Sequence, residues 1–361
     1  HTPGLNLPHN HPSNIPTPRV RLSDIQRLGP APRSPPMTTP RKKLVDAEQP
    51  MHYHLISRCV RRAFLYGVDP VSGKDYSHRK AWVEQRLFRL VKCFAVELNG
   101  YAIMSNHFHL VVYYDPKACA AWSDEDVIER WFHAFPSSKR RVNQDKHLSA
   151  ERERMRNTPE RLAYARQKLG SLSHFMKHLK QPIAWRANQE DGVSGHHFEK
   201  RFYSGALLSE RSLLTAMLYV DLNPVRAHIA NDISQCHNTS IEKRLAELEN
   251  TPQRIDEYLA PLASGIDPRT DAGTDSTQQP RSENPRHHAR QVTATLRQHC
   301  ELLRSLIAAE RHPHLGPSPQ TQQWLLDLDA MRKPQRAYGP LEALQKWTDE
   351  RQFKMVESTI G

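Results

Sequence analysis

The chain has 361 residues, and 38% of them are hydrophobic, so we expect part of it to lie outside a packed core. Lysine and arginine (51) outnumber aspartate and glutamate (39), which gives a net charge of +12 and predicts a polyanionic partner. No apolar run reaches the length of a membrane-spanning helix, and no signal-peptide layout is seen, so we expect a soluble, cytoplasmic protein. The five cysteines include no CxxC pair, which argues against a disulfide framework and a cysteine-rich zinc site.

Composition divides the chain into four parts. Residues 1–50 hold ten of the 27 prolines before Lys42 and predict a disordered basic arm that adds salt-sensitive affinity for a polyanion. Residues 246–291 are polar and predict a linker, and residues 292–361 show helical patterning typical of a small helical module. The main domain is therefore expected at residues 51–245.

The main domain alternates strand-like and helix-like segments. Strands are predicted at 52–60, 101–104 and 108–114. Helices are predicted at 77–96, 123–134, 150–168, 172–188 (interrupted by Pro182) and 209–222. This order predicts an α+β fold with a ferredoxin-like antiparallel sheet that carries helices on one face.

The segment Tyr101–Tyr114 (YAIMSNHFHLVVYY) offers a candidate metal platform. Because alternate residues of a strand share a face, His107 and His109 point to one side while Phe108 points to the other. Two such imidazoles can hold a divalent cation and leave coordination positions open. The alternative is two histidines on a half-exposed strand, since the chain has other pairs of this kind, such as His52 and His54.

A second segment, Ser212–Ala227 (SLLTAMLYVDLNPVRA), places a tyrosine and an amide one helical turn apart. Tyr219 and Asn223 share a helix face if the helix continues that far, and Pro224 is expected to end or kink it. The tyrosine hydroxyl can attack phosphorus, and Asn223 can supply a neutral oxygen ligand. The alternative is a packed helix in which Tyr219 is a core aromatic residue.

Together these segments resemble a known family. Met104-Ser105-Asn106 before His107-Phe108-His109, a basic stretch at 195–202 (GHHFEKRF), and the string 218–227 (LYVDLNPVRA) resemble the single-tyrosine HUH transposases, in particular the REP-associated tyrosine transposases. The similarity runs from about residue 52 to residue 241. The charged segment 139–168 and the helical tail depart from the compact members of that family.

The resemblance implies an activity and a role for each motif residue. His107 and His109 would be ligands of Mg²⁺ or Mn²⁺, Asn223 would complete the metal site, and Tyr219 would be the nucleophile. The implied enzyme is a DNA strand-transferase that nicks and rejoins single-stranded, hairpin-forming DNA through a 5′-phosphotyrosine link. The implied partners are repetitive palindromic DNA sequences. The protein itself would be associated with the nucleoid and would be a monomer or a homodimer.

Cations beside aromatic side chains predict the DNA contacts. The candidates are Arg58, Arg61, Arg62, Asn106, Lys200, Arg201 and Tyr203. On the helix at 172–188, His174, Lys177 and Lys180 recur on one side, which is either a DNA-facing side or, as we favour, an ordinary solvated face.

Two other functions compete with strand transfer. The first is a domesticated relative that binds palindromic repeats without cleaving them. The second is a phosphodiesterase that uses a histidine-bound metal and water, in which Tyr219 is only structural. The first predicts hairpin binding that survives Tyr219→Phe, and the second predicts hydrolysis without a covalent protein–DNA adduct.

Overall fold

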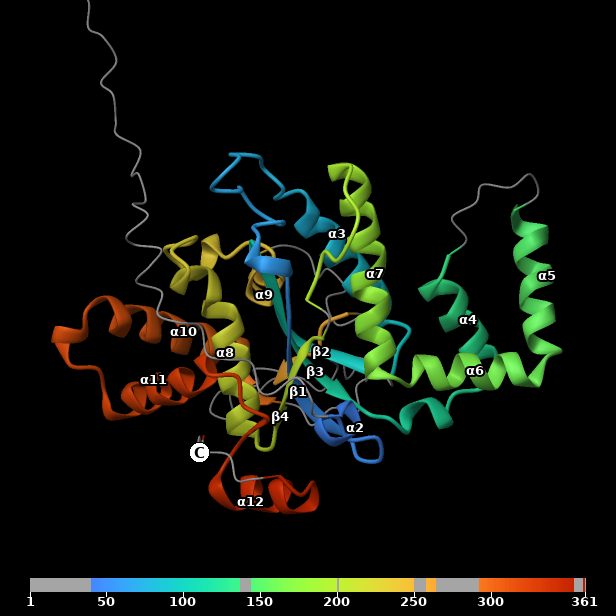
Figure 1. Ribbon diagram of the computed structural model, residues 1–361. Coiled ribbons are helices and arrows are strands. Elements are labelled where there is room, and N and C mark those ends of the chain that lie inside the picture. Colours follow the sequence, from blue (N-terminus) through green and yellow to red (C-terminus); the bar gives the residue numbers. More distant parts are fainter. Residues whose placement is uncertain are drawn as a thin grey trace, which may run out of the picture.

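The computed structural model describes residues 40–136, 144–199, 201–249, 258–263, 292–353 and 360. Its centre is a five-stranded sheet in the order β2-β3-β1-β4-β7 (Figure 1). The strands are β1 (Met51–Arg58), β2 (Val96–Ile103), β3 (His107–Tyr114), β4 (Tyr203–Leu207) and β7 (Ala337–Tyr338). All neighbours are antiparallel except β4 and β7, which are parallel. The α+β fold predicted from the sequence is confirmed.

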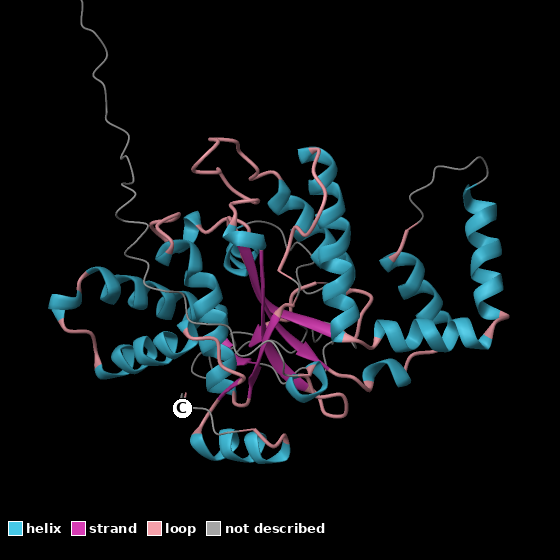
Figure 2. Cartoon of the chain, viewed as in Figure 1, coloured by secondary structure: helices cyan, strands magenta, loops and turns pink. Residues whose placement is uncertain are grey.

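Helices cover both faces of this sheet, so the prediction of helices on one face is wrong. The covering helices are α3 (Arg79–Val91) and α7 (Leu172–Asp191) on one face and α8 (Glu210–Arg226) on the other. Figure 2 shows the strands enclosed between them. The physical reason lies in β3, where Leu110 packs into the core under α3 and α7 while Val111 packs under α8, so both faces need cover.

Two element boundaries differ from the prediction for identifiable reasons. Strand β2 begins at Val96 rather than residue 101, because the register shift between Leu98 and Gly100 makes Asn99-Gly100 a bulge instead of a turn. Helix α8 does not end at Pro224 but continues to Arg226. Helix α7 likewise runs through Pro182 without interruption.

Three helices lie beside the sheet, and the last two of them come from the charged segment 139–168 (Figure 1). These are α4 (Asp124–Ala134), α5 (Gln144–Arg156) and α6 (Pro159–Leu169). Ser123 and Asp126 form a capping box that begins α4, and Pro159 occupies the first turn of α6. Helices α4 and α6 pack on each other, and α6 leads directly into α7.

The C-terminal segment packs on the main domain. Its elements are β6 (Val292–Thr295), α10 (Leu296–Arg311), α11 (Pro319–Arg332), β7 and α12 (Leu341–Glu350). Helices α10 and α11 cover the outer side of α8, β6 pairs with β5 (Leu262–Ala263), and β7 extends the sheet. Helix α9 (Ser240–Glu249), which precedes this segment in the chain, contacts β2. The predicted boundaries at 245 and 291 stay a prediction.

Residues 1–39 of the predicted arm lie outside the described residues. Residues 40–50 are described and contain α2 (Arg41–Leu44), and within them Val45 is buried while residues 47–50 are exposed. The Arg41 guanidinium lies 3.8 Å from the ring centroid of Phe202 and donates to Ser204 Oγ at 2.8 Å, which anchors this end of the arm to β4. Within the described part of the chain, no helix is long and apolar enough to cross a membrane.

Candidate active site

The histidine pair lies on the face of β3 that α8 covers. Strand alternation puts Phe108 into the core under α3 and α7, where it has no exposed surface, and turns His107 and His109 the other way. The centroids of the two imidazole rings are 4.8 Å apart. The predicted platform of two adjacent imidazoles is thus present in the fold.

Tyr219 lies against this pair in the same chain. Ser209 and Ser212 form a capping box that begins α8, and the helix then packs across β2 and β3. The Tyr219 ring centroid is 5.7 Å from that of His109 and 5.8 Å from that of His54. The tyrosine and the histidines, 110 or more residues apart in sequence, therefore form one cluster.

His54, which the sequence offered only as part of a competing pair, supports His109 directly. Its Nε2 lies 2.9 Å from Nδ1 of His109, and the two rings stack at 5.1 Å. In the antiparallel register Ile56 pairs with His109, so His54 is the diagonal neighbour of His109 on the same face. The sequence could not predict this contact, because strand alternation determines which sheet face a side chain lies on but not which residue of the next strand lies beside it. That depends on the register of β1 against β3.

The imidazole nitrogen atoms of the pair are suited to bind a metal ion. Nε2 of His109 is buried without a hydrogen-bond partner, and burial holds the pKa of His109 well below its ordinary value. Burial, followed by the charges of Arg58 and Arg62, lowers the pKa of His107 to about 3. Both imidazoles are therefore neutral at pH 7, which is the form that coordinates metals.

Asn223 lies one turn beyond Tyr219 on α8 and donates from Nδ2 to the Tyr219 carbonyl at 2.7 Å, which leaves its Oδ1 as an acceptor. Among the residues that the structure describes, no three His, Cys, Asp or Glu side chains are grouped to hold a metal ion. The donor set at this place is thus the two imidazoles, and Asn223 lies one helical turn from Tyr219 on α8. This set fits a cation that takes its other ligands from a substrate phosphate or water.

A strained turn carries arginines beside the histidines. Arg61 and Arg62 both have positive φ values, 52° and 55°, which is unfavourable for residues with a Cβ atom, and both side chains are exposed. Asn106 holds this turn, because its Nδ2 donates to the Arg62 carbonyl at 3.2 Å and its Oδ1 lies 2.6 Å from Nδ1 of His107. Arg58 is paired across the strands with His107.

The phenol of Tyr219 experiences two opposed effects. Burial raises its pKa, and the charges of Arg226, Arg332 and Arg58 act in the lowering direction. The Arg226 guanidinium lies 5.9 Å from the Tyr219 ring centroid. At pH 7 the phenol is therefore neutral, and the surrounding positive charge favours both its anion and a bound phosphate.

The other predicted DNA contacts differ in how far they are exposed to solvent. The Tyr203 hydroxyl donates to the Gln335 carbonyl and lies 2.9 Å from the Tyr338 hydroxyl, so it is engaged inside the protein. Its ring packs edge-on against His54 at 6.1 Å. Arg201 is exposed, and Lys200 lies outside the described residues.

The side of α8 that faces α10 and α11 is held by polar contacts that the sequence did not reveal. Asp221 accepts from Ser240 Oγ at 2.7 Å and lies 2.9 Å from Nε2 of His299 on α10. On the same side Arg211 pairs with Asp327 at 2.6 Å and stacks 3.3 Å above the Trp324 ring. The C-terminal segment therefore holds the helix that carries Tyr219.

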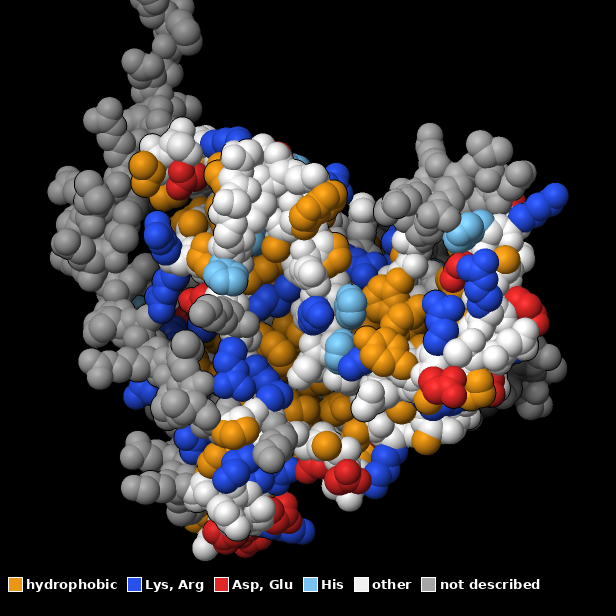
Figure 3. Space-filling model, turned by 45° about the vertical axis from the view of Figure 1, so that its right-hand side comes forward, with side chains coloured by type: hydrophobic (Ala, Val, Ile, Leu, Met, Phe, Trp, Pro, Cys, Tyr) orange, Lys and Arg blue, Asp and Glu red, His pale blue; other side chains and the backbone are white. Residues whose placement is uncertain are grey.

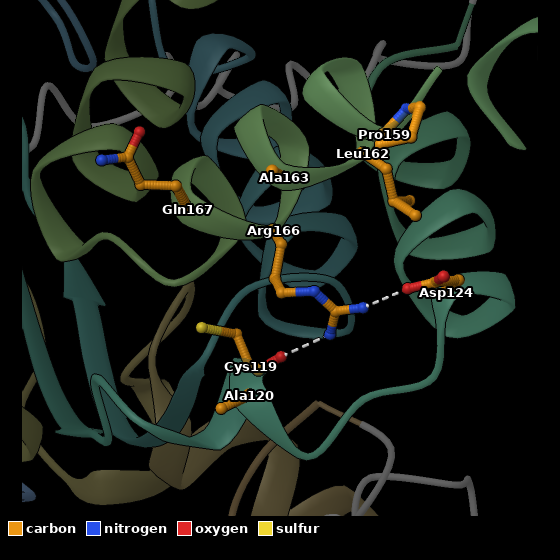
Figure 4. A pocket seen from close by; sticks show the side chains of 8 residues that line it. All are labelled: Cys119, Ala120, Asp124, Pro159, Leu162, Ala163, Arg166 and Gln167. Carbon is orange, nitrogen blue, oxygen red and sulfur yellow. Dashed lines mark hydrogen bonds and ion pairs between the residues drawn. The ribbon is translucent and has the colours of Figure 1, made fainter. Parts of the chain in front are cut away.

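A cavity of about 410 Å³ lies elsewhere, beside α4 and α6 (Figure 4). Arg166 crosses it, but its guanidinium is engaged by the carbonyls of Cys119 and Trp122 and by Asp124 at 2.7 Å. The lining is mostly apolar and shares no residue with the histidine cluster. This cavity carries no candidate chemistry.

Comparison with known proteins gives little for the chain as a whole. No protein-family model and no curated protein matches it. A solved structure of a REP-associated tyrosine transposase bound to a REP hairpin is similar at 11% identity, covering 54% of this chain and 79% of that chain, with a TM-score of 0.29. Overlap at this level does not establish a common fold.

Proposed function

We propose that the protein is a DNA strand-transferase that nicks and rejoins single-stranded, hairpin-forming DNA, with Tyr219 as nucleophile. One observation carries the proposal: Tyr219 lies 5.7 Å from His109, and His109 lies 4.8 Å from His107, in ring-centroid distances within one chain. The motif string around Tyr219 and the antiparallel order β2-β3-β1-β4 of the sheet that carries the histidines support it.

Tyr219 would form a bond from its phenolic oxygen to the scissile phosphorus while the bond from phosphorus to the 3′-oxygen breaks. The phenol loses its proton and the departing 3′-oxygen gains one, so a 5′-phosphotyrosine and a 3′-hydroxyl result. The phosphodiester is exchanged rather than hydrolysed, so rejoining needs no external energy. Arg58 and Arg226 stabilise the added negative charge at the phenol.

His107, His109 and Asn223 would hold Mg²⁺ or Mn²⁺. Such a cation polarises a phosphate oxygen and makes the phosphorus more electrophilic when it is bound. His54 keeps His109 oriented with Nε2 toward the ligand position, since its contact occupies Nδ1. Arg58, Arg61 and Arg62 would contact the DNA backbone beside that position.

A DNA-binding protein without turnover is the second candidate. The observation in its favour is that only two strong metal-ligating side chains meet at the site among the described residues, which is fewer than a tight resident metal needs. In that case the exposed Arg61-Arg62 turn would bind palindromic DNA and Tyr219 would stay unmodified.

The test is a denaturing gel with labelled single-stranded hairpin DNA and Mg²⁺ or Mn²⁺. Strand transfer predicts an SDS-resistant protein–DNA adduct that needs the cation and is lost in Tyr219→Phe and His107→Ala. His52→Ala is the matched control, because His52 lies on the same sheet face but contacts Tyr113 instead of the histidine pair. Complexes on a native gel without any cut strand would favour the binding protein, and cut strands without an adduct would favour hydrolysis.

A further inference from the structure

A second surface with aromatic and basic side chains lies where α4, α6 and α7 meet. We call it the aromatic–basic surface, and it consists of Trp131, Phe135, Tyr164, Lys168, Lys177 and His178. These helices belong to the layer on the α3 and α7 face, so the sheet separates the surface from Tyr219. Figure 3 shows hydrophobic, histidine and basic side chains next to one another over this region.

The aromatic side chains form a continuous chain of edge-to-face contacts that remains open to solvent. Ring centroids are 6.1 Å apart for Tyr164 and Trp131, 4.7 Å for Trp131 and Phe135, and 4.5 Å for Phe135 and His178. Tyr164 is 54% exposed, and Trp131, Phe135 and His178 are only half-buried. A planar ring could therefore stack on this surface without displacing the core.

Basic side chains flank the aromatic rings, and Glu160, one turn before Tyr164 on α6, is an exposed carboxylate on the same side. Lys168 lies 4.8 Å from the Tyr164 ring centroid. Burial, and after it the charges of Lys168 and Lys177, lower the pKa of His174, the neighbour of His178 on α7. Neither lysine has an ion-pair partner among the residues that the structure describes.

Three of the four carboxylates of α4 are paired with arginines: Glu125 with Arg156 at 2.8 Å, Glu129 with Arg152 at 2.8 Å, and Asp124 with Arg166 at 2.7 Å. The fourth, Asp126, caps the helix through Ser123. Aromatic faces flanked by lysines that form no ion pair are complementary to a strand whose bases are unpaired, because bases stack on the rings and phosphates pair with the cations.

We propose that the aromatic–basic surface binds unpaired nucleotides of a DNA strand. Tyr164 and Trp131 stack on bases, and Lys168 and Lys177 contact the adjoining phosphates. The inference goes beyond the proposed strand transfer, because stacking needs neither Tyr219 nor a metal. It also assigns a role to the charged helical segment and to the basic side of α7, which we interpreted from sequence as a solvated face.

The first experiment measures the affinity of a fluorescein-labelled oligothymidylate by anisotropy, in a Tyr219→Phe background so that no covalent bond forms. Tyr164→Ala is expected to raise the dissociation constant about tenfold. Trp185→Ala is the matched control, since Trp185 is 65% exposed on α7 but makes none of these aromatic contacts. Equal dissociation constants for Tyr164→Ala and Trp185→Ala would overturn the proposal, provided circular dichroism shows both variants folded.

The salt dependence tests the phosphate contacts. Lys168→Gln and Lys177→Gln are each expected to reduce the slope of log affinity against log salt by about 0.7. Lys346→Gln removes the same charge from the exposed side of α12 and is expected to leave the slope unchanged. If all three lysine variants change the slope equally, net charge alone explains binding and the surface has no specific role.

Photocrosslinking locates the contact independently of any variant. An oligothymidylate with one 5-iodouracil is irradiated with the Tyr219→Phe protein, and the crosslinked peptides are identified by mass spectrometry. Crosslinks at Trp131 or Tyr164 support the surface, and crosslinks confined to residues 53–66 or 203–219 overturn it. Tighter, Tyr164-dependent binding of oligouridylate would reassign the surface to RNA, and displacement by polyglutamate as readily as by DNA would assign it to an acidic protein.

Discussion

His299 and Asp221 meet inside the protein, with Nε2 of His299 2.9 Å from Oδ2 of Asp221 and neither side chain exposed. Asp221 lies two residues from Tyr219 on α8, and His299 belongs to α10 of the C-terminal segment. The other carboxylate oxygen accepts from Ser240 Oγ and from the Ile241 amide. The pair therefore connects the tyrosine helix to a segment that the sequence suggested was a separate module.

Breaking this pair is expected to destabilise the protein and loosen the tyrosine helix. His299→Ala leaves Asp221 without one of its buried partners, which should lower the free energy of unfolding by about 3 kcal/mol. Chemical denaturation measures it. Glu310→Ala is the control, because its pair with Arg226 is partly exposed and is expected to contribute about 1 kcal/mol or less. Equal losses in the two variants would contradict a special role for the buried pair.

Removing His54 is expected to weaken metal binding without touching a ligand. His54 orients His109 through the contact at 2.9 Å, and loss of such a supporting group typically costs about 10- to 100-fold in metal affinity. Titration of Mn²⁺ followed by electron paramagnetic resonance measures the affinity of His54→Ala. His52→Ala serves as the control from the same strand and face, and an unchanged affinity in His54→Ala would contradict the positioning role.

Replacing Arg61 with glycine is expected to have opposite effects on the stability of the fold and on DNA binding. Arg61→Gly should relieve the positive φ of 52° and stabilise the fold by about 1 kcal/mol, while it removes an exposed cation from the turn and weakens hairpin binding. Arg61→Ala should weaken binding equally but without the gain in stability. Thermal melting and anisotropy separate the two effects. A Gly variant that binds DNA as tightly as the parent would show that the strained arginine has no role in recognition.

Acid is expected to destabilise the fold through His197, which is not one of the candidate metal ligands. His197 is buried against the Tyr66 hydroxyl at 3.0 Å, and burial lowers its pKa from 6.5 to about 4. Between these two values the unfolded chain binds more protons than the folded one, so stability present above pH 6.5 is lost as the pH falls toward 4. The unfolding free energy of His197→Gln should depend less steeply on pH in this window. The exposed His314→Gln should keep the parent slope, and identical slopes for both variants would exclude His197 as the cause.

The sequence was sufficient for those parts of the fold that follow from local patterns. Alternation along residues 107–114 places His107 and His109 on one face, and apolar spacing locates α3, α7 and α8 to within a few residues. The cover on the second sheet face was not predictable in this way, because LVVYY favours a buried strand without saying which helices bury it.

Contacts between distant residues could not be read from local patterns. His54 meets His109 through a register that the sequence does not state, and Asp221 meets His299 across 78 residues. Pro182 and Pro224 show a different limit, since a proline removes one helical hydrogen bond without always ending the helix. Helix α7 runs through Pro182 to Asp191, and α8 runs through Pro224 to Arg226.

The most direct test of the central claim is to identify the atom that becomes attached to DNA. The protein is incubated with a hairpin oligonucleotide and Mn²⁺, digested with protease and nuclease, and the modified peptide is sequenced by mass spectrometry. Strand transfer by Tyr219 predicts a nucleotide 5′-phosphate on the phenolic oxygen of Tyr219 and on no other tyrosine. A cleaved hairpin with an unmodified Tyr219, or with the nucleotide on another residue, would contradict it.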